Sequence, residues 1–144
     1  GAEIARKAPS TSGTLVATGF LRAARGAGQP SASEVAAVAA ALQAAFDGIK
    51  ERGKASPGDK TMLDALGPAL DVLNAAASAG AALPDAIGQA AAAAAEGARA
   101  TTTMRAKAGR AGWLADRSAG HEDAGAHLIA LAFASAAKFV AERA

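Results

Sequence analysis

The chain has 144 residues, the size of one ordinary domain, and a formal net charge of +2. Hydrophobic residues make up 51% and charged residues 19%, a balance typical of a globular protein rather than a disordered one. The chain has no cysteine, which excludes a disulfide framework and thiolate chemistry, and its basic residues do not cluster with aromatic ones, which argues against nucleic-acid binding.

Alanine dominates the composition, and aromatic residues are only 3%. Alanine is the best helix former, and its small side chain lets helices approach closely, so the fold class expected is all-α. No apolar run approaches the roughly 20 residues of a membrane span, and no signal peptide is visible. We therefore expect a cytoplasmic protein with no membrane partner. Because the chain begins Gly-Ala-Glu without methionine, already in a helix-like sequence, a fragment or a trimmed chain is expected.

The first half of the chain predicts a short helical piece and two longer helices. The piece at 1–8 ends before Pro9, and the turn cluster at 9–13 can cap a helix over about 14–25. A second long helix is predicted from about Ser33 to Arg52. Its apolar stripe consists of Val35, Val38, Leu42, Phe46 and Ile49.

The second half predicts three more helices. One runs over about 59–79 with a leucine stripe, and Pro68 inside it suggests a kink because proline removes one hydrogen bond of the ladder. Pro84 suits the first residue of the next helix. The small residues on all sides of that helix indicate burial between neighbours, or a surface that something must approach at backbone distance. A last helix is predicted over about 122–144.

Three polar, glycine-containing segments lie at predicted helix ends: 10–13, 52–62 and 109–125. In a bundle with short loops, such ends can gather at one rim. Free N–H groups at helix starts bind anions, hydroxyls add donors, and an arginine such as Arg110 can bind phosphate with two hydrogen bonds. The residues themselves therefore predict a phosphate or nucleotide site, although neither GxxxxGK[ST] nor GxGxxG is present.

Simpler readings of these residues stay open. Asp59 is most simply the N-cap of the helix that follows, and Met62 is most simply a core residue. His121, Asp123 and His127 have no recognised metal-ligand spacing, so a metal site there is not favoured.

Taken together, the three segments resemble one family. RGKASPGDKTMLDALGPAL, at 52–70, is similar to the RGKA-x-x-GDKTM-x-D signature of the L subunit, or C-terminal nucleotide-binding domain, of dihydroxyacetone kinases. GRAGWLADRSAGHEDAGA, at 109–126, resembles the family's GRAS-Y-L-G-x-R-S-x-G-H-x-DPGA segment. STSGTLVATGFLRAA, at 10–24, resembles its G-x-SGPL-x-x-x-F-x-x-A segment. Their order and spacing also fit, over nearly the whole chain.

The resemblance implies an antiparallel helical bundle or barrel of the DhaL type, with a nucleotide at one rim. It implies one nucleotide-binding domain over residues 1–144, incomplete at its N-terminus. The cofactors implied are ATP or ADP with Mg²⁺. The nucleotide-binding residues implied by matching positions are Thr11, Ser12, Gly53, Met62, Arg110, Asp123, Ala124 and Gly125.

The family transfers a phosphoryl group to dihydroxyacetone held by a separate K subunit or domain. The resemblance therefore implies a kinase component that acts on dihydroxyacetone or a similar short ketose. Its expected partners are that subunit, a phosphotransferase-system phosphoryl donor in some forms, and a second copy in a homodimer. The alternative is a non-catalytic helical bundle that binds a partner or an apolar ligand.

Two departures from the family pattern bear on activity. Gly112 and Ala124 replace the family's GRAS serine and DPG proline. The aspartate-rich loop that holds magnesium in the family is expected ahead of Gly1, together with the first helix. Because phosphoryl transfer depends on metal charge at the phosphates, this chain alone is expected to lack catalytic and metal-binding residues and to be inactive.

Overall fold

The computed structural model describes residues 1–7, 10–28, 30–108 and 118–143, and all the regular structure in these ranges is helical. This confirms the all-α fold class. The elements in chain order are α1 (Ala2–Lys7), α2 (Thr11–Gly26), α3 (Glu34–Gly53), α4 (Leu63–Ser78), α5 (Leu83–Ala100), the 3₁₀-helix η1 (Thr101–Thr103) and α6 (Ala124–Ala141).

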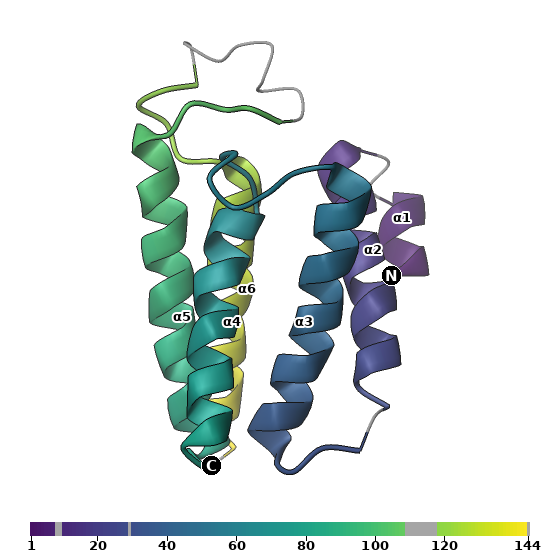
Figure 1. Cartoon of the computed structure of the whole chain (residues 1–144), viewed down its shortest axis with the longest axis vertical. Helices are drawn as coiled ribbons and strands as arrows, with labels where there is room; N and C mark the ends of the chain where they lie inside the picture. Colours follow the sequence, from purple (N-terminus) through teal and green to yellow (C-terminus); the bar gives the residue numbers. More distant parts are fainter. Residues whose placement is uncertain (8–9, 29, 109–117, 144) are drawn as a thin grey trace.

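The five long helices form an antiparallel bundle (Figure 1). Each of α2, α3, α4 and α5 packs against the next long helix, and α4 also contacts α6. This up-and-down order brings the start of α2, the α3–α4 loop and the start of α6 to the same end of the bundle (Figure 1). The bundle expected from the sequence is thus observed, and the polar segments 10–13 and 52–62 and the described part of the third, 118–125, lie near one end.

The core combines leucines on α4 with alanines on α5. Leu63 and Leu73 are fully buried, as are four alanines at a spacing of four residues along α5: Ala86, Ala90, Ala94 and Ala98. The small side chains let α5 approach its neighbours closely, and the approach is tightest at Gly97. A Cβ atom at Gly97 would lie 3.0 Å from the Cα atom of Ala65 on α4. Helix α5 therefore packs between α4 and α6 through one face, whereas its other side, which includes Gly88, Gln89 and Ala92, is exposed, so the predicted burial holds for that face only.

Serine and aspartate side chains cap three of the helices. The Ser10 hydroxyl accepts a hydrogen bond from the Gly13 N–H at the start of α2, which confirms the capping role expected for the turn cluster. Ser33 caps α3 in the same way. Asp123 caps α6 through the Ala126 N–H. Each cap satisfies a backbone donor that has no acceptor within its helix.

The prediction that Asp59 is the N-cap of the fourth helix is wrong, because α4 begins four residues later, at Leu63. Lys60 has a positive φ of 61°, a left-handed conformation that a right-handed helix cannot contain. The Asp59 carboxylate accepts a hydrogen bond from the Ser56 N–H and so closes a turn ahead of the helix.

Helix α6 is more apolar than the sequence analysis allowed. It has 18 residues and, by length and composition alone, could cross a membrane, so the statement that no apolar run approaches a span is wrong here. Length and composition do not separate such a span from a helix of a bundle. In the bundle, α6 packs against α5 and buries Ala126 and Phe133, while Leu131 and Phe139 on its other side are each 55% exposed.

Candidate functional site

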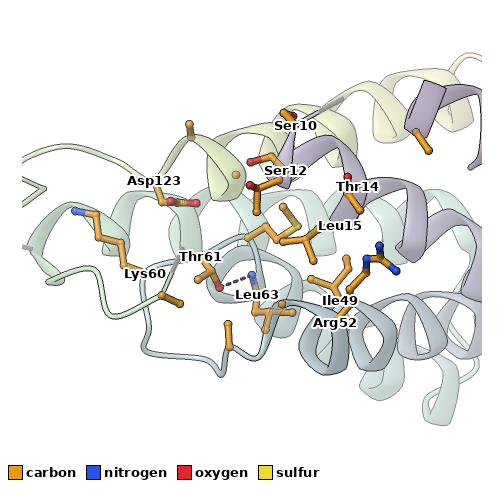
Figure 2. Close-up of a pocket in the computed structure, with 18 residues that line it drawn as sticks. Ser10, Ser12, Thr14, Leu15, Ile49, Arg52, Lys60, Thr61, Leu63 and Asp123 are labelled. Carbon is orange, nitrogen blue, oxygen red and sulfur yellow. Dashed lines mark hydrogen bonds between the residues drawn. The ribbon is translucent and has the colours of Figure 1, made fainter. Parts of the chain in front are cut away.

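A cavity of about 830 Å³ lies at the end of the bundle where α2 and α6 begin. Its walls come from the first turn of α2, the end of α3, the α3–α4 loop and the segment that leads into α6 (Figure 2). The volume is within the range of small-molecule and cofactor pockets.

The structure gathers most of the residues that the family resemblance indicates around this one cavity. Seven of the eight line it: Thr11, Ser12, Gly53, Met62, Asp123, Ala124 and Gly125. The eighth, Arg110, lies outside the described residues.

The first turn of α2 presents polar groups to the cavity. The Thr14 N–H donates to the Ser10 carbonyl, and the Gly13 N–H donates to the Ser10 hydroxyl. No described residue accepts a hydrogen bond from the N–H groups of Thr11 and Ser12. Both residues are exposed, and the helix has no acidic residue in its first turn. These two N–H groups and the positive end of the helix dipole suit an anion.

The inner wall of the cavity is apolar. Leu15 from α2, Ile49 from α3 and Leu63 from α4 contribute side chains (Figure 2), and Met62, directly ahead of α4, also lines the cavity. Gly53 faces Leu15, and a Cβ atom added there would lie 3.4 Å from a Leu15 methyl group. The cavity therefore combines a polar edge with an apolar interior, as ligand pockets commonly do.

The α3–α4 loop owes its shape to the Asp64 carboxylate. That side chain is buried and accepts hydrogen bonds from the Thr61 N–H, at 2.7 Å, and from the Gly58 N–H. Gly58 has a φ of 92°, a conformation open to glycine and costly for most other residues. The carboxylate thus fixes the turn that carries Lys60 and Thr61 to the cavity.

Lys60 is buried and lies beside the cavity, with 3% of its surface exposed. Its ammonium group donates to the backbone carbonyls of Met104, at 3.1 Å, and Ser118. In Figure 2 its side chain extends away from the α2 end of the cavity, on the side of Asp123.

Asp123 is the only carboxylate among the described residues that line the cavity. Its backbone N–H donates to the buried Thr101 hydroxyl at 2.8 Å, which ties the start of α6 to the end of α5. Burial raises the pKa of the Asp123 carboxyl above its ordinary value of 3.8. The N–H groups of Ala126 and Gly125 and the charge of Lys60 act against this rise, while the Asp64 charge adds to it.

Gly125 brings α6 close to Met62. A Cβ atom at Gly125 would lie 3.3 Å from the Met62 Cβ and 3.0 Å from an Asp123 carboxylate oxygen. Met62 is buried and belongs to the main core cluster, so its core role is confirmed along with its place at the cavity.

Five polar residues that line the cavity are not among those indicated individually by the sequence. These are Ser10, Thr14, Arg52, Lys60 and Thr61. Three of them lie inside the RGKASPGDKTM segment, so the motif already contained the signal. No group of three or more possible metal ligands occurs in the described ranges. The His127 Nδ1 atom lies 3.3 Å from a Glu122 carboxylate oxygen.

Comparisons with known proteins agree with the resemblance found in the sequence. Residues 1–138 match the DAK2 domain family. The ADP-binding subunit DhaL of the PEP-dependent dihydroxyacetone kinase of Escherichia coli is 37% identical over 115 residues, which are 80% of this chain and 55% of that subunit. Its counterpart in the dihydroxyacetone kinase 1 of Listeria innocua is 32% identical over 133 residues, which are 92% of this chain and 61% of that subunit.

A third relative is a longer protein. The D-erythrulose kinase of Mycolicibacterium smegmatis is 43% identical over 129 residues, which are 88% of this chain and 22% of that kinase. The chain thus spans less than two thirds of each of these three relatives. Since the family match covers all but the last six residues, the chain belongs to the DAK2 domain family.

Proposed function

We propose that the cavity binds ADP or ATP and that the chain is the nucleotide-binding component of a kinase for dihydroxyacetone, erythrulose or a similar short ketose. The observation that carries the proposal is the gathering of seven motif residues, from three separate segments, around one cavity. The names of the relatives support the ligand and substrate classes, since they describe an ADP-binding subunit and an erythrulose kinase.

The polar edge of the cavity suits the phosphates. The N–H groups and hydroxyls of Thr11 and Ser12 are donors at a helix start, where the backbone and the helix dipole favour an anion. Arg52 lines the same cavity and adds a positive charge, and Arg110 is the second arginine that we expect at the phosphates. The apolar wall of Leu15, Ile49 and Met62 suits the nucleotide base.

Magnesium would accompany the phosphates. It supplies the charge that neutralises the transferring phosphoryl group, and it is usually held by one or two carboxylates together with phosphate oxygens. Asp123 offers one such carboxylate among the described residues that line the cavity, and one carboxylate is the smallest number that such a magnesium site uses. Further metal ligands ahead of Gly1, and inactivity of this chain without them, stay predictions.

The partners follow from the same class of reaction. The PEP-dependent relatives support a second subunit that presents the ketose and a phosphotransferase-system protein that renews the phosphoryl donor. The chain's own part is to hold the nucleotide at the end of the bundle.

Isothermal titration calorimetry of the 144-residue chain with ADP and ATP, with and without Mg²⁺, tests the proposal. We expect a dissociation constant below about 1 mM for at least one nucleotide, equivalent to about 4 kcal/mol of binding. The double variant Thr11→Ala, Ser12→Ala should weaken it at least about tenfold. Ser135→Ala, on the exposed side of α6, should leave it unchanged. The proposal would be refuted if the folded chain bound neither ADP nor ATP.

A second candidate function rests on the outer surfaces of α2 and α6. Phe20 and Leu21 on α2 are 57% and 51% exposed, and Leu131 and Phe139 on α6 are each 55% exposed. Exposed apolar side chains of this size suit a partner surface. Association that depends on concentration in analytical ultracentrifugation, abolished by Phe139→Ser and not by ADP, would favour this partner-binding bundle.

A further inference from the structure

Lys60 is a buried cation whose ammonium group, among the described residues, donates to backbone carbonyls and forms no direct ion pair with a carboxylate. Its exposed fraction is 3%, and the two acceptors of its ammonium group are the carbonyls of Met104 and Ser118. Burial of an ammonium group is costly unless its donors are satisfied. An apolar side chain would fill the same space at a lower cost, so the hydrogen bonds of Lys60 call for a reason other than packing.

The two carbonyls lie on the two sides of the connection between η1 and α6. Met104 directly follows η1, and Ser118 is the first of the described residues that lead into α6. Lys60 itself belongs to the α3–α4 loop, 44 and 58 residues earlier in the chain. One side chain therefore joins three stretches that are distant in sequence.

Other hydrogen bonds cross the same junction. The Lys107 N–H donates to the Asp59 carbonyl at 3.1 Å, and the Gly120 N–H donates to the Thr102 carbonyl at 2.9 Å. The Ala106 N–H donates to the Ser118 hydroxyl at 3.2 Å. Lys107, next to Ala108, is thus bonded to the α3–α4 loop, and both Ala108 and Asp123 line the cavity.

We propose that Lys60 is a positioning residue for nucleotide binding: its ammonium group fixes the stretches around Met104 and Ser118 against the α3–α4 loop, and so sets the wall of the cavity formed by Ala108 and Asp123. Lys60 acts through the backbone and does not touch the phosphates. The inference rests on the proposed nucleotide function for its effect on affinity, whereas its effect on the junction is independent of any ligand.

The experiment compares Lys60→Met with Lys107→Met. Both variants remove one positive charge at the same junction, but the Lys107 side chain is 68% exposed, whereas that of Lys60 is buried. Two readouts are needed: amide hydrogen exchange without nucleotide, and the dissociation constant for ADP by calorimetry. Circular dichroism checks that each variant keeps its helices.

We expect Lys60→Met to speed exchange at the Ala106, Lys107, Gly120 and Asp123 amides and to weaken ADP binding at least about tenfold. Lys107→Met should leave both readouts near those of the unmodified chain. Unchanged exchange at these amides in folded Lys60→Met would overturn the inference, as would a loss of affinity no larger than in Lys107→Met.

Chemical restoration of an ammonium group at position 60 distinguishes the effect of that group from a general loss of stability. The chain has no cysteine, so Lys60→Cys provides a single thiol that can be alkylated in denaturant before refolding. Alkylation with 2-bromoethylamine restores an ammonium group at nearly the length of lysine, whereas iodoacetamide leaves a neutral amide. The aminoethylated protein should regain slow exchange and ADP affinity, and the amide form should not. Equal behaviour of the two would overturn the inference.

This pair also replaces Lys60→Met if that variant does not fold. If the unmodified chain does not bind ADP, the proposed function fails, and hydrogen exchange still decides whether Lys60 fixes the junction.

Discussion

Replacing Gly97 by alanine should loosen the contact between α4 and α5 on which the candidate site depends. The new Cβ atom would lie 3.0 Å from the Ala65 Cα and still closer to the Asp64 carbonyl oxygen. Both are backbone atoms of α4 and cannot rotate away, so one helix must shift. The shift would reach the site, because Asp64 also shapes the α3–α4 loop.

The magnitude follows from two opposing terms. Overpacking of a close contact costs about 1–3 kcal/mol, and replacing glycine by alanine inside a helix returns about 1 kcal/mol. Gly88 is a matched control, because it lies on the same helix, is exposed and has no atom within 4 Å of an added Cβ. Gly88→Ala should therefore stabilise the chain by about 1 kcal/mol.

The difference between the two variants isolates the cost of the contact. Urea unfolding followed by circular dichroism should place Gly97→Ala about 1–3 kcal/mol below Gly88→Ala in free energy of unfolding. In thermal unfolding the gap should be several degrees, since about 1 kcal/mol shifts Tm by roughly 3–4 °C at this size. Equal stability of the two variants would refute the argument that α5 needs glycine at this position.

Two further predictions concern carboxylates at the site. Asp64→Ala should cost about 2–4 kcal/mol, because it leaves the N–H groups of Gly58 and Thr61 without their acceptor. Asp71→Ala, on the exposed side of α4, should cost under about 1 kcal/mol, and a similar loss in both variants by urea unfolding would contradict this role. Burial raises the pKa of Asp123, so the folded chain binds that proton more tightly than the unfolded chain does. The Asp123 contribution to stability should then fall as pH rises from about 3.8 through the raised pKa and stay low above it. Asp123→Asn keeps a capping side chain but cannot titrate. The free energy of unfolding of this variant, relative to that of the unmodified chain, should therefore rise between pH 4 and 7. A decrease over this range would contradict the raised pKa of Asp123.

The helices that could be predicted from sequence are those with local signals. Ser33 followed by an apolar stripe predicted a helix over 33–52, and α3 runs over Glu34–Gly53 with Ser33 as its cap. The small residues after Pro84 predicted a buried helix, and α5 carries four fully buried alanines. Such signals lie within a few residues of the structure that they specify.

The features that could not be predicted depend on contacts between distant segments. Lys60 has a left-handed backbone conformation, so α4 begins only after it, at Leu63. The hydrogen-bond partners of the Lys60 ammonium group are 44 and 58 residues away in sequence. No spacing rule links Lys60 to Met104 and Ser118. Seven residues that line the cavity, in contrast, were indicated by family motifs, since the residues that make a motif lie together in sequence.

Nuclear magnetic resonance tests most directly the central claim that the cavity at the end of the bundle is a nucleotide site. A titration of ¹⁵N-labelled chain with ADP and Mg²⁺ reports each backbone amide separately. The account predicts that the largest shifts fall on Thr11, Ser12, Gly53, Met62 and Gly125 and that they saturate together. Saturating shifts confined to other surfaces, such as the exposed side of α6, or no shifts at 10 mM ADP, roughly ten times the weakest dissociation constant expected here, would contradict it.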